Sequence, residues 1–151
     1  MCLSQITDVI KAFLTPMIAI LAVWIAYQQH KTSRYKLRLD LYDKRFEVFH
    51  RLISLVSSVV QQGNVTDEQL FEFLRSTAYA NFLFDKDIEI YLEQVYRKGI
   101  DLHYLEKRIK ELSGDKQKEV YDKRDIIFNW FKDQFTESRK RFGRYLNFRR
   151  I

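Results

Sequence analysis

The sequence has few residues that break helices, and it has a single cysteine that could form a disulfide bond. Its 151 residues include 4 Gly, 1 Pro and 1 Cys. A single cysteine excludes a disulfide framework and a zinc site built from cysteines. The scarcity of glycine and proline argues against a domain of many short strands and turns. Hydrophobic residues make up 46% of the chain, which also excludes disordered and low-complexity classes.

An uncharged apolar run, AFLTPMIAILAVWIAY, occupies residues 12–27, and the next charge is Lys31. A bilayer requires about 20 mostly apolar helical residues, and residues 9–27 supply this length. Trp24 and Tyr27 stand at one end, as in an aromatic belt. We predict a transmembrane helix over residues 9–30 and prefer it to a buried core helix. A cleaved signal peptide fits less well, because Pro16 interrupts the run and a basic flank follows it.

The charges beside this run predict the orientation of the chain. Four basic residues follow it before the first acid, Asp40, and they are Lys31, Arg34, Lys36 and Arg38. Basic flanks stay on the cytoplasmic side of a membrane. We therefore expect a short extracytoplasmic tail over residues 1–8 and a cytoplasmic helical domain over residues 31–151. This topology corresponds to a single-pass protein of a bacterial inner membrane, with Cys2 on the outer side.

A heptad pattern begins directly after the basic flank. Apolar and aromatic residues alternate at spacings of 4 and 3, which predicts a long helix with a packing seam. This heptad seam consists of Tyr35, Leu39, Tyr42, Phe46, Phe49, Ile53, Val56 and Val60. A second stripe beside it consists of Leu41, Val48, Leu52, Leu55 and Val59. We predict that Tyr42, Phe46, Phe49, Ile53 and Val56 contact another copy of the chain or a partner.

Three further helices are predicted over residues 67–84, 87–113 and 115–143. Gly63 is expected to cap the first helix in a left-handed conformation, and Thr66 with Gln69 forms a capping box. Gly99 falls on an apolar seam, which predicts a close approach of two helices. The predicted fold is therefore all-α, with one transmembrane helix that continues into an antiparallel bundle of about four long helices.

The second group of basic residues lies near the C-terminus. No acid follows Glu137, whereas Arg139, Lys140, Arg141 and Arg144 do. An antiparallel bundle would bring these residues back toward the basic flank, so we interpret both groups as contacts to an anionic membrane surface. A solvated C-terminal tail and a nucleic-acid contact are the alternatives, but no nucleic-acid recognition motif accompanies these residues.

The span contains a stripe of small residues, Thr15, Ala19, Ala22 and Ala26, at spacings of 4, 3 and 4. Small residues at this spacing let transmembrane helices approach one another closely. The stripe therefore favours self-association or pairing with another membrane protein.

Signatures of enzymes are missing from the sequence. It has no phosphate-binding glycine loop, no nucleophile elbow and no CxxC motif. Glu47 and His50 match the Glu-x-x-His spacing of di-iron bundles, but the chain lacks the second pair that such a site requires. We therefore predict no catalytic residue, no cofactor and no metal ligand.

Three stretches of the chain carry a family resemblance. They are WIAYQQHKTSRYKLRLDLYDKRFEVFHRL, FLFDKDIEIYLEQVYRKGIDLHYLEKRI and WFKDQFTESRKRFGRYL, and the LDLYDKRFEVF motif of residues 39–49 is the most specific part. With these stretches the chain resembles a widespread group of uncharacterised bacterial single-pass inner-membrane proteins with a short cytoplasmic helical domain. The resemblance implies a topology and carries over no catalytic residue.

Two functions of different classes are consistent with this sequence. The first is a non-enzymatic membrane protein whose cytoplasmic helical domain assembles with itself or docks a membrane or cytoplasmic partner. The second is a small oligomeric effector that permeabilises the membrane, as in a toxin or antiphage module. The scarcity of polar residues in the span counts against a water-filled pore. Nucleic-acid binding and metal binding are weaker alternatives.

Overall fold

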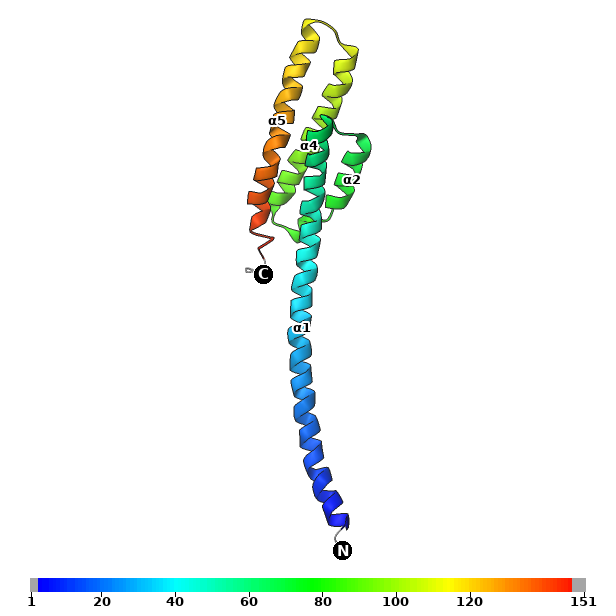
Figure 1. Cartoon of the computed structure of the whole chain (residues 1–151), viewed down its shortest axis with the longest axis vertical. Coiled ribbons are helices and arrows are strands. Elements are labelled where there is room, and N and C mark those ends of the chain that lie inside the picture. Colours follow the sequence, from blue (N-terminus) through cyan, green and yellow to red (C-terminus); the bar gives the residue numbers. More distant parts are fainter. Residues whose placement is uncertain (1–2, 148–151) are drawn as a thin grey trace. The chain divides into compact units, whose positions relative to one another are not determined.

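A computed structural model of the chain describes residues 3–147, and it describes the side chains of Leu14 and of residues 16–147. All regular structure in this part is helical (Figure 1). The helices are α1 (Leu3–Gln62), α2 (Asp67–Thr77), α3 (Ala80–Leu83), α4 (Lys86–Glu111) and α5 (Asp115–Gly143). The chain divides into two compact units, residues 1–40 and residues 41–151.

The first unit is the N-terminal part of α1. Every side chain described in this unit is exposed, including the apolar ones of the predicted span. Within the part whose side chains are described, no helix has a stretch long and apolar enough to cross a membrane. The predicted span of residues 9–30 begins outside that part, because the side chains of residues 9–13 and Thr15 are not described.

The second unit contains the hydrophobic core. Figure 1 shows α4 and α5 running antiparallel, and α2 and α3 pack on α4. Leu52, Val56 and Val59 of α1 are completely buried among them, as are Ile88 of α4 and Phe131 of α5. Burial of such side chains contributes about 1.5–3 kcal/mol each to folding. The predicted all-α bundle is therefore confirmed, with short α3 as an addition.

The helix ends follow the predicted capping signals. The backbone N–H of Gln69 donates to Thr66 Oγ1 at 3.2 Å, and the Thr66 N–H donates to Gln69 Oε1 at 3.0 Å. Gly63 has a φ of 73°, in the left-handed region where glycine is favoured. Gly63 therefore reverses the chain after α1, and the capping box pairs the backbone N–H groups of Thr66 and Gln69 at the start of α2.

Gly99 lies where α4 and α2 approach each other most closely. A Cβ atom added at Gly99 would lie 2.6 Å from Cδ2 of Leu70. Real Cβ atoms essentially never come this close, so a side chain at position 99 would have to displace Leu70. The prediction that Gly99 permits a close helix approach is confirmed.

The helix predicted over residues 67–84 is wrong in its length. The hydroxyls of Ser76 and Thr77 both donate to the carbonyl oxygen of Phe73, at 3.0 and 2.8 Å. Such bonds compete with helix propagation, and α2 ends at Thr77 before a new short helix, α3, begins at Ala80. Phe73 of α2 is buried, whereas Leu74 is 44% exposed.

Candidate functional site

Arg45 joins α1 to the segment that connects α3 and α4. Its Nε donates a 2.9 Å hydrogen bond to the carbonyl oxygen of Leu83. Its guanidinium also lies over two aromatic rings, 5.9 Å from the centroid of Phe84 and 5.5 Å from that of Tyr145. Cation–π contacts of this kind stabilise a partly desolvated arginine. Arg45 therefore holds together three segments that are distant in sequence.

Tyr145 completes this cluster after the end of α5. Its hydroxyl donates to Asp85 Oδ2 at 2.8 Å and lies 3.1 Å from Asp87 Oδ1. The Arg144 guanidinium lies 2.6 Å from both the Tyr145 hydroxyl and Asp87 Oδ1. Desolvation and the hydrogen bond to Asp85 raise the pKa of Tyr145. We call Arg45, Phe84, Asp85, Asp87, Arg144 and Tyr145 the Arg45 cluster.

The Arg45 cluster explains the LDLYDKRFEVF motif in structural terms. Arg45 binds the α3–α4 connection, Val48 is buried in the core, and the Phe49 ring lies 5.4 Å from that of Phe142. Three residues of the motif therefore fix α1 against α5 and α3. We find no arrangement of acid, base and nucleophile in this cluster, and its charges neutralise one another.

A buried polar network joins α4 to α5. The Tyr91 hydroxyl donates to Gln134 Oε1 at 2.9 Å, and Gln134 Nε2 donates to the Trp130 carbonyl at 2.7 Å. Arg141 stacks on the Tyr91 ring at 4.7 Å. Burial raises the pKa of Tyr91 far above its ordinary value, although the charge of Arg141 opposes this shift. A satisfied network of this kind fixes the register of two helices.

Arg124 of α5 binds the chain just after the C-terminal end of α1. Its Nε donates to Glu106 Oε1 at 2.7 Å, and its Nη2 donates to the carbonyl oxygen of Gly63 at 2.9 Å. Burial alone would lower the pKa of Arg124, but the hydrogen bonds and charges of Asp125 and Glu106 together raise it. The α1–α2 turn is thereby tied to α4 and α5.

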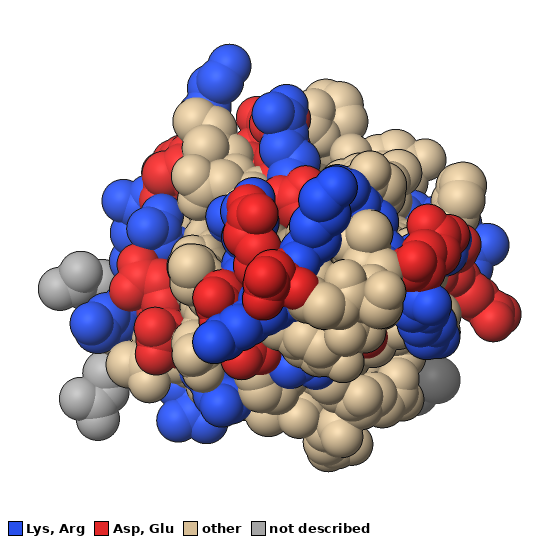
Figure 2. All heavy atoms as spheres, turned by 90° about the horizontal axis from the view of Figure 1, so that it is seen from above, with Lys and Arg blue, Asp and Glu red and all other residues tan. Residues whose placement is uncertain are grey.

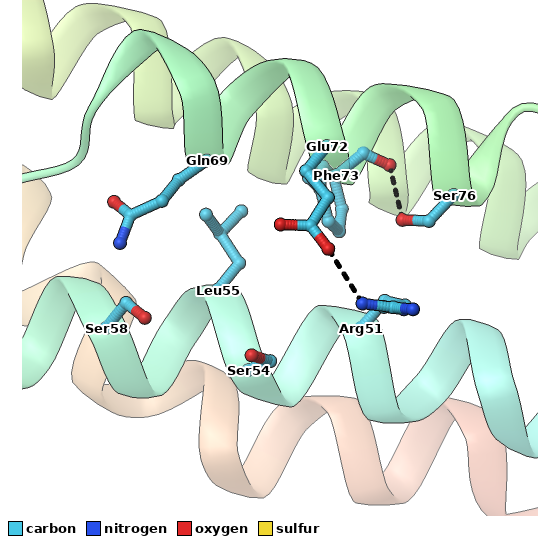
Figure 3. A pocket seen from close by; sticks show the side chains of 8 residues that line it. All are labelled: Arg51, Ser54, Leu55, Ser58, Gln69, Glu72, Phe73 and Ser76. Atoms are coloured by element: carbon cyan, nitrogen blue, oxygen red, sulfur yellow. Dashed lines mark hydrogen bonds and ion pairs between the residues drawn. The ribbon is translucent and has the colours of Figure 1, made fainter.

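A polar groove of about 150 Å³ lies between α1 and α2. Figure 3 shows Arg51 and Glu72 reaching toward each other across it, and their charged atoms are 2.8 Å apart. The remaining lining includes Ser54 and Ser58 of α1 and Ser76 of α2. Because the ion pair neutralises itself, the groove offers hydroxyl groups for hydrogen bonds but no net charge. Its lining includes no histidine and no cysteine.

The predicted heptad seam divides into a buried end and an exposed end. Val56 is completely buried, so it packs within the chain and cannot contact a partner. Phe49 and Ile53 are half-buried, and Phe49 contacts Phe142. Tyr42 is half-buried, and Phe46, which stacks on it, is 44% exposed. The core face of α1 is instead the second stripe, led by Val48, Leu52, Leu55 and Val59.

The predicted basic residues differ in their pairing. Lys31, Arg34, Lys36 and Arg38 are all exposed, and none forms an ion pair within the described part of the chain. Lys31, Arg34 and Arg38 line a shallow groove of about 160 Å³ together with Tyr35. Near the C-terminus, Arg139 and Lys140 are exposed. Arg141, in contrast, pairs with Glu137 at 2.8 Å, and Arg144 pairs with Asp87.

The other predicted residues have simple environments. Ala19, Ala22 and Ala26 are exposed on α1, and Thr15 lies outside the described side chains. Among the described residues, no three His, Cys, Asp or Glu side chains come close enough to hold a metal ion. Figure 2 shows acidic and basic side chains intermingled over the visible face, which includes the α4–α5 turn. That face carries no continuous positive surface of the kind that nucleic-acid binding requires.

Sequence reasoning missed the Arg45 cluster. Arg45 and Leu83 are 38 residues apart, and no spacing rule connects them. In the sequence, Asp85 and Asp87 are the cap and first-turn acid at the start of α4. Their arrangement beside an aromatic pair, Phe84 and Tyr145, is a tertiary feature that local patterns do not report.

The fold and this cluster define an all-α protein with a helical bundle built on the C-terminal half of α1. Comparison with family models, curated proteins and solved structures finds no match. The resemblance to bacterial single-pass membrane proteins therefore stays a prediction.

Proposed function

We propose that the chain is a non-enzymatic single-pass membrane protein whose helical bundle docks a protein partner at the inner face of the membrane. The N-terminal part of α1 is the anchor, with residues 1–8 outside the cell and residues 31–151 inside. The bundle is the docking domain, and the basic residues hold its ends against anionic lipid.

The observation that carries this proposal is a belt of exposed apolar side chains around α1. Nine large apolar or aromatic side chains between residues 14 and 27 are each 48–71% exposed. They are Leu14, Met17, Ile18, Ile20, Leu21, Val23, Trp24, Ile25 and Tyr27. They lie on every side of the helix, and exposing so much apolar surface to water is costly. Lipid is the surrounding that covers all sides of one helix at once.

The cations that follow the belt support the same proposal. Most arginines of the bundle pair with acids, as Arg51 does with Glu72. Lys31, Arg34 and Arg38, by contrast, line one groove of α1 that contains no acid. An anionic phospholipid headgroup would supply the missing negative charge, at about 1 kcal/mol per basic residue.

The bundle itself supports docking rather than catalysis. Its grooves are small and its charged clusters are neutral, whereas several large side chains of α2, α3 and the turn between them face outward. Phe71 is 72% exposed, Tyr79 is 72% exposed and Phe82 is 80% exposed. Aromatic residues are enriched at the centres of protein interfaces.

Alkaline carbonate extraction of membranes tests the anchor. We expect the wild-type chain to stay in the membrane pellet, whereas the variant Ile18→Arg/Ile25→Arg should move to the supernatant. The matched control is Ile90→Arg/Ile126→Arg, which makes the same change at isoleucines of the bundle that are 48% and 69% exposed. This control should stay in the pellet. Release of the wild-type chain by carbonate would overturn the proposal, and depolarisation of cells that express it would favour the permeabilising alternative.

A further inference from the structure

The apolar repeat of α1 continues toward the N-terminus, beyond the heptad seam. Stepping back from Leu39 in spacings of 4 and 3 gives Tyr35, Thr32, Gln28, Ile25, Leu21, Ile18 and Leu14. We call these eight residues the α1 dimer face. Its six apolar or aromatic members are each 46–60% exposed, and all eight residues belong to the first unit.

From this face we infer that a second copy of the chain packs along α1, in parallel and in register. The inference rests on the proposed membrane anchor, because two chains inserted in one direction have parallel α1 helices at the same depth. Each residue of the dimer face then meets its own copy. A repeat at spacings of 3 and 4 is the pattern that buries one helix against another with the same repeat.

Two members of the dimer face lie where lipid tails cannot cover them. Tyr35 and Leu39 lie beyond the proposed span, among and just after the basic residues, and they are 60% and 46% exposed. In that layer a second protein surface would bury them more completely than headgroups and water do. A second copy is the partner that carries the same apolar residues at the same height.

The polar members of the dimer face are also compatible with a second copy. A carboxamide donates and accepts hydrogen bonds, so Gln28 can pair with Gln28 of the other copy. A polar residue at one seam position commonly fixes register and orientation in parallel coiled coils. Thr32 needs no partner, because its hydroxyl donates to the carbonyl oxygen of Gln28 at 2.9 Å. Pro16 falls on the opposite face, so its interruption of the helix does not enter the interface.

Flanking charges modulate this association. In a parallel heptad pair, Lys31 of one chain lies across the seam from Lys36 of the other, and their repulsion weakens the dimer. Lys36→Glu should replace this repulsion with attraction and tighten association about fivefold. Arg34→Glu makes the same change of charge at a position that faces away from the seam, so it should not tighten association.

Oxidative cross-linking in membranes tests the inference. In a Cys2→Ser background, Tyr35→Cys and Leu39→Cys should each form a covalent dimer, because these residues meet their own copies. Leu37→Cys is the matched control, since Leu37 is 70% exposed on the opposite face and should stay monomeric. Homotypic cross-links at two separate positions also require a parallel arrangement.

The outcomes separate this inference from the proposed anchor. Cross-links at residues 35 and 39 but not at 37 support the parallel dimer, as does a larger cross-linked fraction in the Lys36→Glu variant. Equal cross-linking at all three positions, or none at any, would overturn it. Either negative result in a chain that resists carbonate extraction leaves the anchor standing. A chain that carbonate releases contradicts the anchor instead, and the dimer with it.

Discussion

The Nε atom of Arg45 donates a 2.9 Å hydrogen bond to the carbonyl oxygen of Leu83, 38 residues further along the chain. Leu83 is the last residue of α3. The same guanidinium lies over the ring of Tyr145, which follows α5. Arg45 therefore joins this part of α1 to the ends of two other elements.

Replacing Arg45 should destabilise the bundle. Arg45→Met keeps the aliphatic stem but leaves the Leu83 carbonyl without its donor and removes the cation from the Phe84 and Tyr145 rings. We expect a loss of about 1.5–3 kcal/mol in the free energy of unfolding, measured by urea titration in detergent. The control Lys44→Met alters a neighbouring cation that is 70% exposed and should be close to neutral. Equal effects of the two substitutions would contradict a special role for Arg45.

A methyl group at position 99 should force the buried Leu70 side chain into another rotamer or separate α4 from α2. The added Cβ of Gly99→Ala would lie 2.6 Å from Leu70 Cδ2, and Leu70 is buried. Overpacking of this kind costs about 1–3 kcal/mol. Gly143→Ala is the control, because a Cβ there meets nothing within 4 Å. This change should leave the free energy of unfolding unchanged or raise it slightly. Wild-type stability in Gly99→Ala would show that the two helices are not packed as described.

Two phenylalanines of the heptad seam should differ in how much stability the bundle loses when each is replaced by aspartate. Phe49→Asp places an unpaired carboxylate against Phe142, so we expect a loss of about 3 kcal/mol or more. Phe46 is 44% exposed, so Phe46→Asp should cost less than about 1 kcal/mol. Thermal unfolding followed by circular dichroism compares them. If Phe46→Asp were the more damaging change, the description of the seam as buried at one end would be incorrect.

Much of this fold could be predicted from sequence because its signals are local. Helix caps such as Gly63 and the Thr66–Gln69 box act within a few residues, and the 3-and-4 spacing reports which face is apolar. The same spacing did not distinguish the heptad seam from the stripe beside it. That choice depends on where α4 and α5 pack, which brings Leu52 and Val59 to the centre and leaves Phe46 at the edge.

The candidate site could be predicted less well, because its contacts are tertiary. The end of α2 at Thr77 coincides with two hydrogen bonds, from the hydroxyls of Ser76 and Thr77 to the Phe73 carbonyl. Composition identified the basic residues near the C-terminus as one group. Only the packing of α5 on α4 shows that Arg141 and Arg144 belong to the folded domain whereas Arg139 and Lys140 face outward.

Among the basic residues near the C-terminus, one pair should therefore affect membrane binding and the other pair should affect stability. Arg139→Gln/Lys140→Gln should weaken co-sedimentation of residues 31–151 with anionic vesicles about tenfold, without lowering the unfolding temperature. Arg141→Gln/Arg144→Gln should lower the unfolding temperature, because it removes partners of Glu137 and Asp87. Neutral vesicles provide the baseline. Unchanged binding of the first variant at low salt would remove these residues from the membrane surface.

The most direct test of the proposed anchor is the side of the membrane on which Cys2 lies. Because Cys2 is the only cysteine, a membrane-impermeant maleimide applied to intact bacterial cells reports one position. A Cys2→Ser/Ser113→Cys chain reports the exposed α4–α5 turn in the same way. We expect Cys2 to be labelled in intact cells and the cysteine at position 113 to be labelled only after lysis. Labelling of position 113 in intact cells, or of Cys2 only after lysis, would contradict the proposed anchor.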